Sequence, residues 1–202
     1  MLERLKVRHS QHDEDQNKGV TAGQLQHVFR TYFVLIATSI LIMGFVSRNL
    51  FQVFLPTELY SDPEHEILVT MLVLGILLSL SQLFRGWFAS YRGYLKGLRE
   101  LLASGSRRMI VALCLFAAVG EECFFRGVIQ HHLGLGATCC VVLVLYSLAT
   151  LRISAWSVFG FLQSLLLGVA FIELKTLYPV IAIHFTLNLA LLLWPRLRQT
   201  SQ

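Results

Sequence analysis

Long apolar runs, separated by short polar segments, dominate the chain from about residue 31 onward. A run of about 20 apolar residues crosses a hydrocarbon core of about 30 Å as a helix. The apolar positions are continuous rather than confined to one helical face, so the pattern does not fit a soluble amphipathic fold. The six expected transmembrane helices cover residues 31–50, 67–84, 109–130, 134–151, 156–174 and 177–194.

The polar segments between these runs predict different structures. Residues 51–66 contain Pro56, Pro63 and four acidic side chains, which favours a loop in water. Residues 85–108 place aromatic residues and leucines at a spacing of three to four, with Arg and Lys between them. This spacing is typical of an amphipathic helix in the plane of the lipid headgroups, and a plain basic loop is the alternative. The first 30 residues hold no continuous apolar run, so we expect no cleavable signal peptide.

The composition supports a membrane protein. The chain of 202 residues is 55% hydrophobic and 14% charged, against about 45–50% and about 25% in soluble domains. We therefore expect an all-α membrane protein, a bundle of about six transmembrane helices plus an interfacial amphipathic helix. The four cysteines lie in apolar stretches without a paired metal or redox spacing, which predicts small core residues.

The net charge of +5 predicts topology rather than a nucleic-acid partner. With a cytoplasmic amino terminus, fourteen of the 17 Lys and Arg residues fall in cytoplasmic segments or at their edges. This asymmetry follows the positive-inside rule. We therefore expect a multi-pass protein, in contact with membrane lipid, with both termini cytoplasmic, in a bacterial cytoplasmic membrane.

These features divide the chain into five parts. A polar cytoplasmic tail, a helix pair, a basic interfacial segment, a four-helix core and a second cytoplasmic tail are expected at residues 1–30, 31–84, 85–108, 109–194 and 195–202.

Ionisable residues are rare inside the expected helices, where each costs about 2.5–3.5 kcal/mol on insertion scales. Glu121, Glu122 and Arg126 all fall within 109–130. Glu121 lies about 18 Å along that helix, close to the middle of the bilayer. Glu122 and Arg126 are four residues apart and can pair on one face, which leaves Glu121 on a neighbouring angle.

The last expected helix carries His184 and Asn188 four residues apart on one face. We expect this face and the two glutamates, Glu121 and Glu122, to border a common polar cavity. The alternative is structural, with a buried ion pair on one helix and an interhelical hydrogen-bonding pair on the other.

Two motifs resemble those of a known family. The segment GEECFFRG is similar to the EExxxR motif, and HFTLN to the HxxxN motif, of the CAAX protease and bacteriocin-processing family of intramembrane proteases, also called Abi. The resemblance covers about residues 109–194. It implies an intramembrane endopeptidase in which Glu121 activates the attacking water. It further implies that Glu122 and Arg126 support that helix.

The same resemblance assigns roles on the last helix. His184 would help to bind or polarise the water, and Asn188 would stabilise the oxyanion of the tetrahedral intermediate. An apolar site can raise the pKa of a glutamate so that it serves as a general base, and an amide stabilises negative charge without burying another charge.

The chain departs from the family at a second motif, FxxxH. Tyr146 stands at the Phe position and Thr150 at the His position. The resemblance therefore implies that Thr150 lies on the wall of the polar cavity as a supporting residue. A neutral hydroxyl is a poor metal ligand beside imidazole. Glu121 and His184 alone are too few for the three protein ligands of an ordinary catalytic zinc. The cofactor is therefore left open, with a divalent metal only weakly supported.

Two classes of function remain open from the sequence. The first is a glutamate-dependent endopeptidase that cuts a peptide or membrane-protein substrate near the membrane. The second is a catalytically weakened relative that acts as a membrane scaffold, an immunity factor or a regulator of a partner. A secondary transporter would require broken helices or paired halves, which this sequence does not display.

Overall fold

A computed structural model describes residues 62–102, 105–149 and 151–199, together with Arg30, Phe33, Val34, 36–38 and Leu41. Most of the expected helix at 31–50, the tail at 1–30 and Thr150 lie outside the described residues. The described core is all helical, and its elements are α3 (Pro63–Trp87), α4 (Ala89–Leu101), α5 (Arg107–Glu122), the π-helix η1 (Cys123–Gln130), α6 (His131–Ala149), α7 (Ala155–Leu174) and α8 (Leu177–Gln199).

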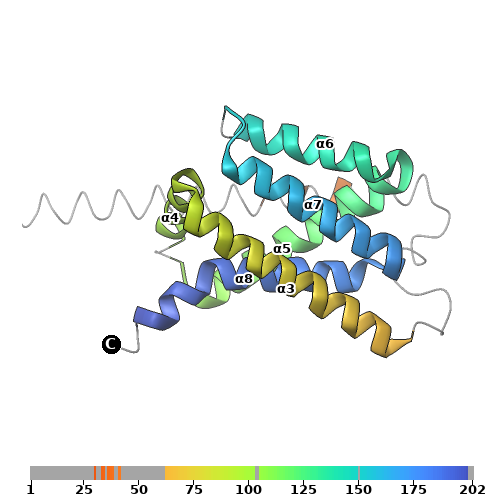
Figure 1. Ribbon diagram of the computed structural model, residues 1–202, viewed down its shortest axis with the longest axis horizontal. Coiled ribbons are helices and arrows are strands. Elements are labelled where there is room, and N and C mark those ends of the chain that lie inside the picture. The colour runs from red at the N-terminus through yellow and green to blue at the C-terminus, as the bar shows by residue number, and fades with distance from the viewer. Residues whose placement is uncertain are drawn as a thin grey trace, which may run out of the picture.

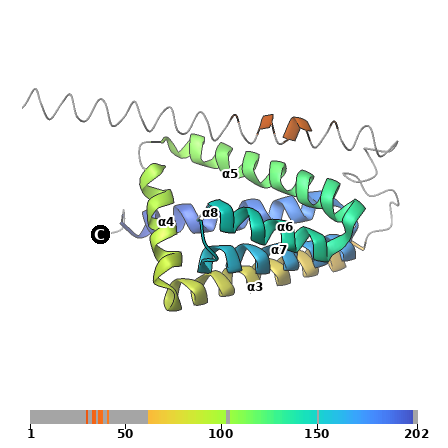
Figure 2. The same ribbon diagram turned by 90° about the horizontal axis from the view of Figure 1, so that it is seen from above.

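Long apolar helices run side by side and form the bundle (Figure 1). Among the residues that the structure describes, three helical stretches are long and apolar enough to cross a membrane, at 63–87, 107–148 and 155–174, and the apolar segment 177–193 is shorter. The 107–148 stretch doubles back on itself, so α5 and α6 lie as separate passes (Figure 2). This arrangement agrees with the separate helices expected at 109–130 and 134–151.

The chain reverses direction at Gly134, near the start of α6 and just after η1. This residue has a φ of 83°, a backbone conformation that disfavours residues with a Cβ. The Thr138 hydroxyl donates to the Gly134 carbonyl at 3.0 Å and secures the first turn after the reversal. A single glycine therefore sets the point at which the chain turns back.

The helix α3 begins earlier than expected. Asp62 caps it through the Glu64 amide, Pro63 occupies the first turn, and Glu64 and Glu66 lie near the positive end of the helix dipole. The prediction of an aqueous loop over 51–66 is therefore wrong at its carboxyl end, because residues 63–66 are already helical.

The predicted amphipathic helix is present as α4, with narrower bounds than 85–108. It lies across one end of the bundle, roughly perpendicular to the long helices (Figure 2). Its Tyr91 and Leu95 are buried, while Arg92 and Lys96 are exposed. The Arg92 guanidinium donates to the carbonyls of Arg85 and Gly86 at 2.9 and 3.0 Å, so it caps the end of α3 and fixes the corner between the two helices.

The helix α7 packs closely against its neighbours through two glycines. A Cβ at Gly160 would overlap the ring of Tyr146, and one at Gly168 would overlap Leu135.

Among the cysteines, Cys140 is exposed on α6, so the prediction that every cysteine is a core residue is wrong there. In a bilayer such an exposed apolar position meets lipid, which the sequence pattern alone does not separate from the core.

Candidate active site

The two glutamates at the end of α5 point into different surroundings. Consecutive residues of an α-helix are about 100° apart around its axis. The side chain of Glu122 is fully buried, whereas that of Glu121 is 15% exposed. The helix therefore presents one carboxylate to the protein interior and the other to an accessible space.

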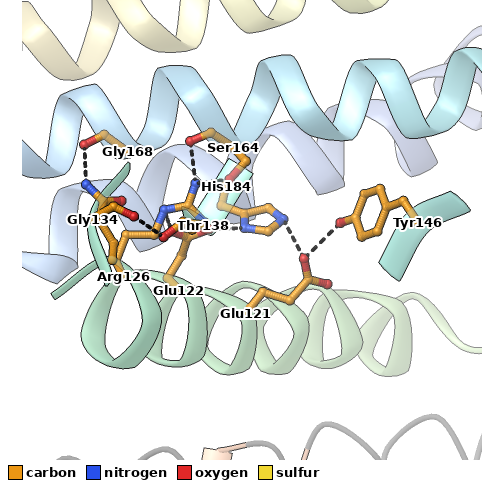
Figure 3. Close-up of polar contacts among 10 residues, drawn as sticks. Glu121, Glu122, Arg126, Gly134, Thr138, Tyr146, Ser164, Gly168 and His184 are labelled. Carbon is orange, nitrogen blue, oxygen red and sulfur yellow. Dashed lines mark hydrogen bonds and ion pairs between the residues drawn. The ribbon is translucent and has the colours of Figure 1, made fainter. Parts of the chain in front are cut away.

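Glu122 lies at the centre of a buried polar cluster (Figure 3). Its Oε2 forms an ion pair with Arg126 Nε at 3.0 Å, as the spacing of four residues predicts. Arg126 Nη2 donates to the backbone carbonyl of Ser164 at 2.9 Å and reaches the Ser164 hydroxyl at 3.3 Å. The ion pair and the additional hydrogen bonds to Ser164 together offset part of the cost of burying the charges of Glu122 and Arg126.

The π-helix η1 directs its polar side chains toward α7. Arg126 contacts Ser164, and four residues later Gln130 Nε2 donates to the Gly168 carbonyl at 2.8 Å. The two contacts are four residues apart on both helices, so they connect η1 and α7 at two successive turns. Wide π-turns are common at functional sites because they redirect side chains.

His184 connects the buried cluster to Glu121. Its Nδ1 lies 2.6 Å from Glu122 Oε1. An ionised carboxylate only accepts hydrogen bonds, so Nδ1 carries the proton, and in the neutral form of the ring Nε2 keeps a lone pair. This Nε2 faces Glu121 Oε2 at 3.9 Å. The separation is too long for a direct hydrogen bond, but a single water can bridge it.

A second side chain reaches the same oxygen of Glu121. The Tyr146 hydroxyl on α6 donates to Glu121 Oε2 at 3.0 Å (Figure 3). The sequence comparison treated Tyr146 only as a substitute for a Phe. The sequence did contain a signal for this contact. A Tyr at the Phe position adds a hydroxyl, and the apolar helix that carries it follows the helix that carries Glu121.

A cavity of about 220 Å³ opens beside Glu121, His184 and Asn188. The expectation that these three residues share one cavity agrees with the structure. Its remaining wall is mainly apolar rather than polar, because leucines of α4 and α8 line it. Glu122 does not line this cavity. It borders a small adjoining space of about 10 Å³, because its carboxylate is held between Arg126 and His184.

The donor set does not fit an ordinary metal site. Within the described ranges, no group of three or more His, Cys, Asp or Glu side chains gathers closely enough to hold a metal ion. Glu122, which could have joined Glu121 and His184, is already engaged by Arg126.

Comparison with known families agrees with the motifs. Residues 103–190 match the family model described as type II CAAX prenyl endopeptidase Rce1-like. This part, less than half of the chain, is similar to that family, which agrees with the resemblance of the motifs to the CAAX protease and bacteriocin-processing family. The protein is thus an all-α integral membrane protein with a segment that is similar to a protease family. No curated protein and no solved structure matches the chain significantly.

Proposed function

We propose that the protein is an intramembrane endopeptidase in which Glu121 is the general base. The observation that carries this proposal is the 3.9 Å gap between Glu121 Oε2 and His184 Nε2 at the edge of an accessible cavity. A water in that gap contacts a proton acceptor on each side. Glu121 is also the more accessible of the two glutamates.

The reaction follows from these groups. Glu121 takes a proton from the water as the water oxygen bonds to the peptide carbonyl carbon. Asn188, on the same cavity, donates from its amide to the oxyanion of the tetrahedral intermediate. The protonated Glu121 then delivers its proton to the leaving nitrogen as the carbon–nitrogen bond breaks. One water is consumed, and a carboxyl end and an amino end are produced.

The buried cluster supports this chemistry without touching the substrate. Arg126 pairs with the Glu122 carboxylate, and Glu122 in turn accepts the Nδ1 proton of His184. The ring is thereby fixed in the tautomer that presents an unprotonated Nε2 to the water. Glu122 and Arg126 are thus positioning residues, in agreement with the supporting roles that the resemblance implies.

The position of α4 indicates where the substrate is cut. The helix lines the cavity with Tyr94, Leu95 and Leu98. Its basic residues belong to the side that the charge asymmetry assigns to the cytoplasm. The substrate is therefore a peptide or membrane protein with its scissile bond near the cytoplasmic surface, in a bacterial membrane. Both termini of the enzyme lie on that same side.

Peptide cleavage in proteoliposomes tests the proposal. The probe is a pool of internally quenched peptides, with and without a prenylated carboxyl-terminal CAAX sequence, and mass spectrometry identifies the products. We expect the wild type to cut at least one peptide and Glu121→Gln to cut none. The matched control is Glu100→Gln, which makes the same change on an exposed residue of α4.

The competing function is a non-catalytic scaffold or regulator, favoured by the Thr at position 150 where the family has His. Two results would establish it over the endopeptidase. One is equal cleavage by wild type and Glu121→Gln, and the other is no cleavage of any peptide by the wild type.

A further inference from the structure

We infer that the Tyr146 hydroxyl is a positioning group for catalysis, which holds the Glu121 carboxylate against the water site. This inference rests on the proposed function. The Tyr146 hydroxyl and His184 Nε2 both face Glu121 Oε2, at 3.0 and 3.9 Å. The two groups come from α6 and α8, so Glu121 Oε2 accepts a hydrogen bond from α6 and faces His184 of α8.

A free glutamate side chain is a poorly placed base. Its terminal torsion is broad, and ordering a glutamate side chain costs up to about 1.5–2 kcal/mol. A hydroxyl that donates to one carboxylate oxygen restricts this torsion before the substrate arrives. Misplacement of a reacting group by about 1 Å can lower a rate about 100-fold, so a fixed carboxylate is a kinetic advantage.

The Tyr146 ring is itself held rigidly. On one side it packs against the backbone of Gly160, where a Cβ would overlap the ring. It also stacks on Trp156 with ring centroids 5.9 Å apart and planes 10° apart. Trp156 stacks in turn on Tyr94 of α4, at 4.0 Å and 20°. The hydroxyl therefore has a defined direction, toward Glu121.

The hydroxyl distinguishes Tyr146 from the residue that the family pattern has at this position. The family pattern that this chain resembles has Phe at position 146, and a phenyl ring cannot donate a hydrogen bond. The ring packing against Gly160 and Trp156 would be satisfied equally well by Phe. Packing therefore does not explain the hydroxyl, whereas the hydrogen bond to Glu121 does.

Steady-state kinetics of Tyr146→Phe test the inference, with the peptide that the wild type cuts in proteoliposomes. We expect kcat to fall about tenfold and KM to change less than about twofold, because a reactive group is misplaced while the cavity is preserved. The matched control is Tyr91→Phe. Tyr91 is buried and stacks on the same Trp156 at 5.7 Å, but lies outside the catalytic cavity. Its kcat should equal that of the wild type.

A second variant reaches the same hydrogen bond from the opposite side. Gly160→Ala should displace the Tyr146 ring and lower kcat to a similar extent. The double variant should be no slower than the slower single variant, because both remove one interaction. Losses in kcat that multiply would show that the two residues act independently and would overturn the inference.

The outcomes separate this inference from the proposed function. A wild-type kcat for Tyr146→Phe, or a change in KM alone, combined with an inactive Glu121→Gln, overturns the role of Tyr146 and keeps the endopeptidase. An active Glu121→Gln overturns the endopeptidase and with it the role of Tyr146.

Discussion

The adjacent residues Glu121 and Glu122 at the end of α5 have different surroundings, and we propose different roles for them. Glu122 is enclosed by Arg126 and His184, and Glu121 meets Tyr146 and the cavity. One helix step therefore separates a structural charge from the proposed base. The distinction gives the two glutamates opposite mutational signatures.

Glu122→Gln should lower the stability of the folded protein, and it should have a smaller effect on the cleavage rate of those molecules that do fold. The amide cannot neutralise Arg126, which is only 2% exposed, and breaking a buried pair costs about 3–5 kcal/mol. Thermal unfolding in detergent should show a large fall in Tm for Glu122→Gln and little change for Glu121→Gln. Equal Tm values would contradict the assignment of Glu122 to the structural cluster.

Position 150 offers a test of the departure from the family pattern. The double variant Tyr146→Phe, Thr150→His re-creates FxxxH, and we expect it to cleave faster than Tyr146→Phe alone. The reason is that an imidazole can hydrogen-bond or accept a proton where a threonine cannot take one at neutral pH. The control is Tyr146→Phe, Thr150→Val, and a rate no higher than this control would count against the expectation. The measurement is peptide cleavage in proteoliposomes.

At the scale of elements, α4 is hydrogen-bonded to α8 where α8 lacks one of its own backbone hydrogen bonds. Pro195 has no N–H, so the carbonyl of Leu191, four residues earlier, lacks its usual helical donor. Arg99 supplies the donor, with Nη2 at 2.7 Å and Nε at 3.2 Å from that oxygen. The contact keeps a wall of the cavity in place.

Arg99→Gln should loosen α4 and open the cavity. Losing the charge-assisted hydrogen bond to this partly buried carbonyl costs about 1–3 kcal/mol. In a variant that keeps Cys114 as its only cysteine, alkylation of this cavity residue should become faster. Lys96→Gln, on the exposed side of α4, is the control and should leave the alkylation rate unchanged. An unchanged rate for Arg99→Gln would show that α4 is held by packing alone.

The reversal between α5 and α6 allows backbone strain to be measured separately from packing. A Cβ at Gly134 or at Gly136 meets nothing within 4 Å, but only Gly134 has a positive φ. Gly134→Ala should therefore lower the free energy of unfolding by about 1–3 kcal/mol, because a φ of 83° with a ψ of 174° is a conformation that essentially only glycine adopts. Gly136→Ala, inside α6, should be neutral or stabilising. Similar denaturant midpoints for the two variants would contradict the role of Gly134.

For the whole molecule, the charge asymmetry predicts that the ends of α3 lie on opposite sides of the membrane. Single cysteines replace the exposed residues Glu64 and Gly97 in a background without other cysteines. A membrane-impermeant maleimide added to intact cells should label position 64 and leave position 97 unlabelled until the cells are opened. Labelling of both positions from the outside would overturn the cytoplasmic assignment of α4.

The sequence by itself determined the features that depend on local composition and spacing. Apolar runs separated by breaks predicted α7 and α8 to within a few residues, because a membrane helix satisfies its own backbone hydrogen bonds. The Glu122–Arg126 pair followed from a spacing of four. The start of α3 was placed too late, because Pro63 and the acidic residues were interpreted as a loop although they also favour a helix start.

Only the tertiary structure decided how the site is connected. His184 meets Glu122 across 62 residues, Tyr146 meets Glu121 across 25, and Arg99 meets Leu191 across 92. Each contact depends on the rotation and axial position of one helix against another. These are set by side-chain packing, such as that of Gly160 under Tyr146, and not by the hydrophobic period of either helix. The sequence could therefore nominate the polar residues, but the packing of the helices determines which atoms face one another.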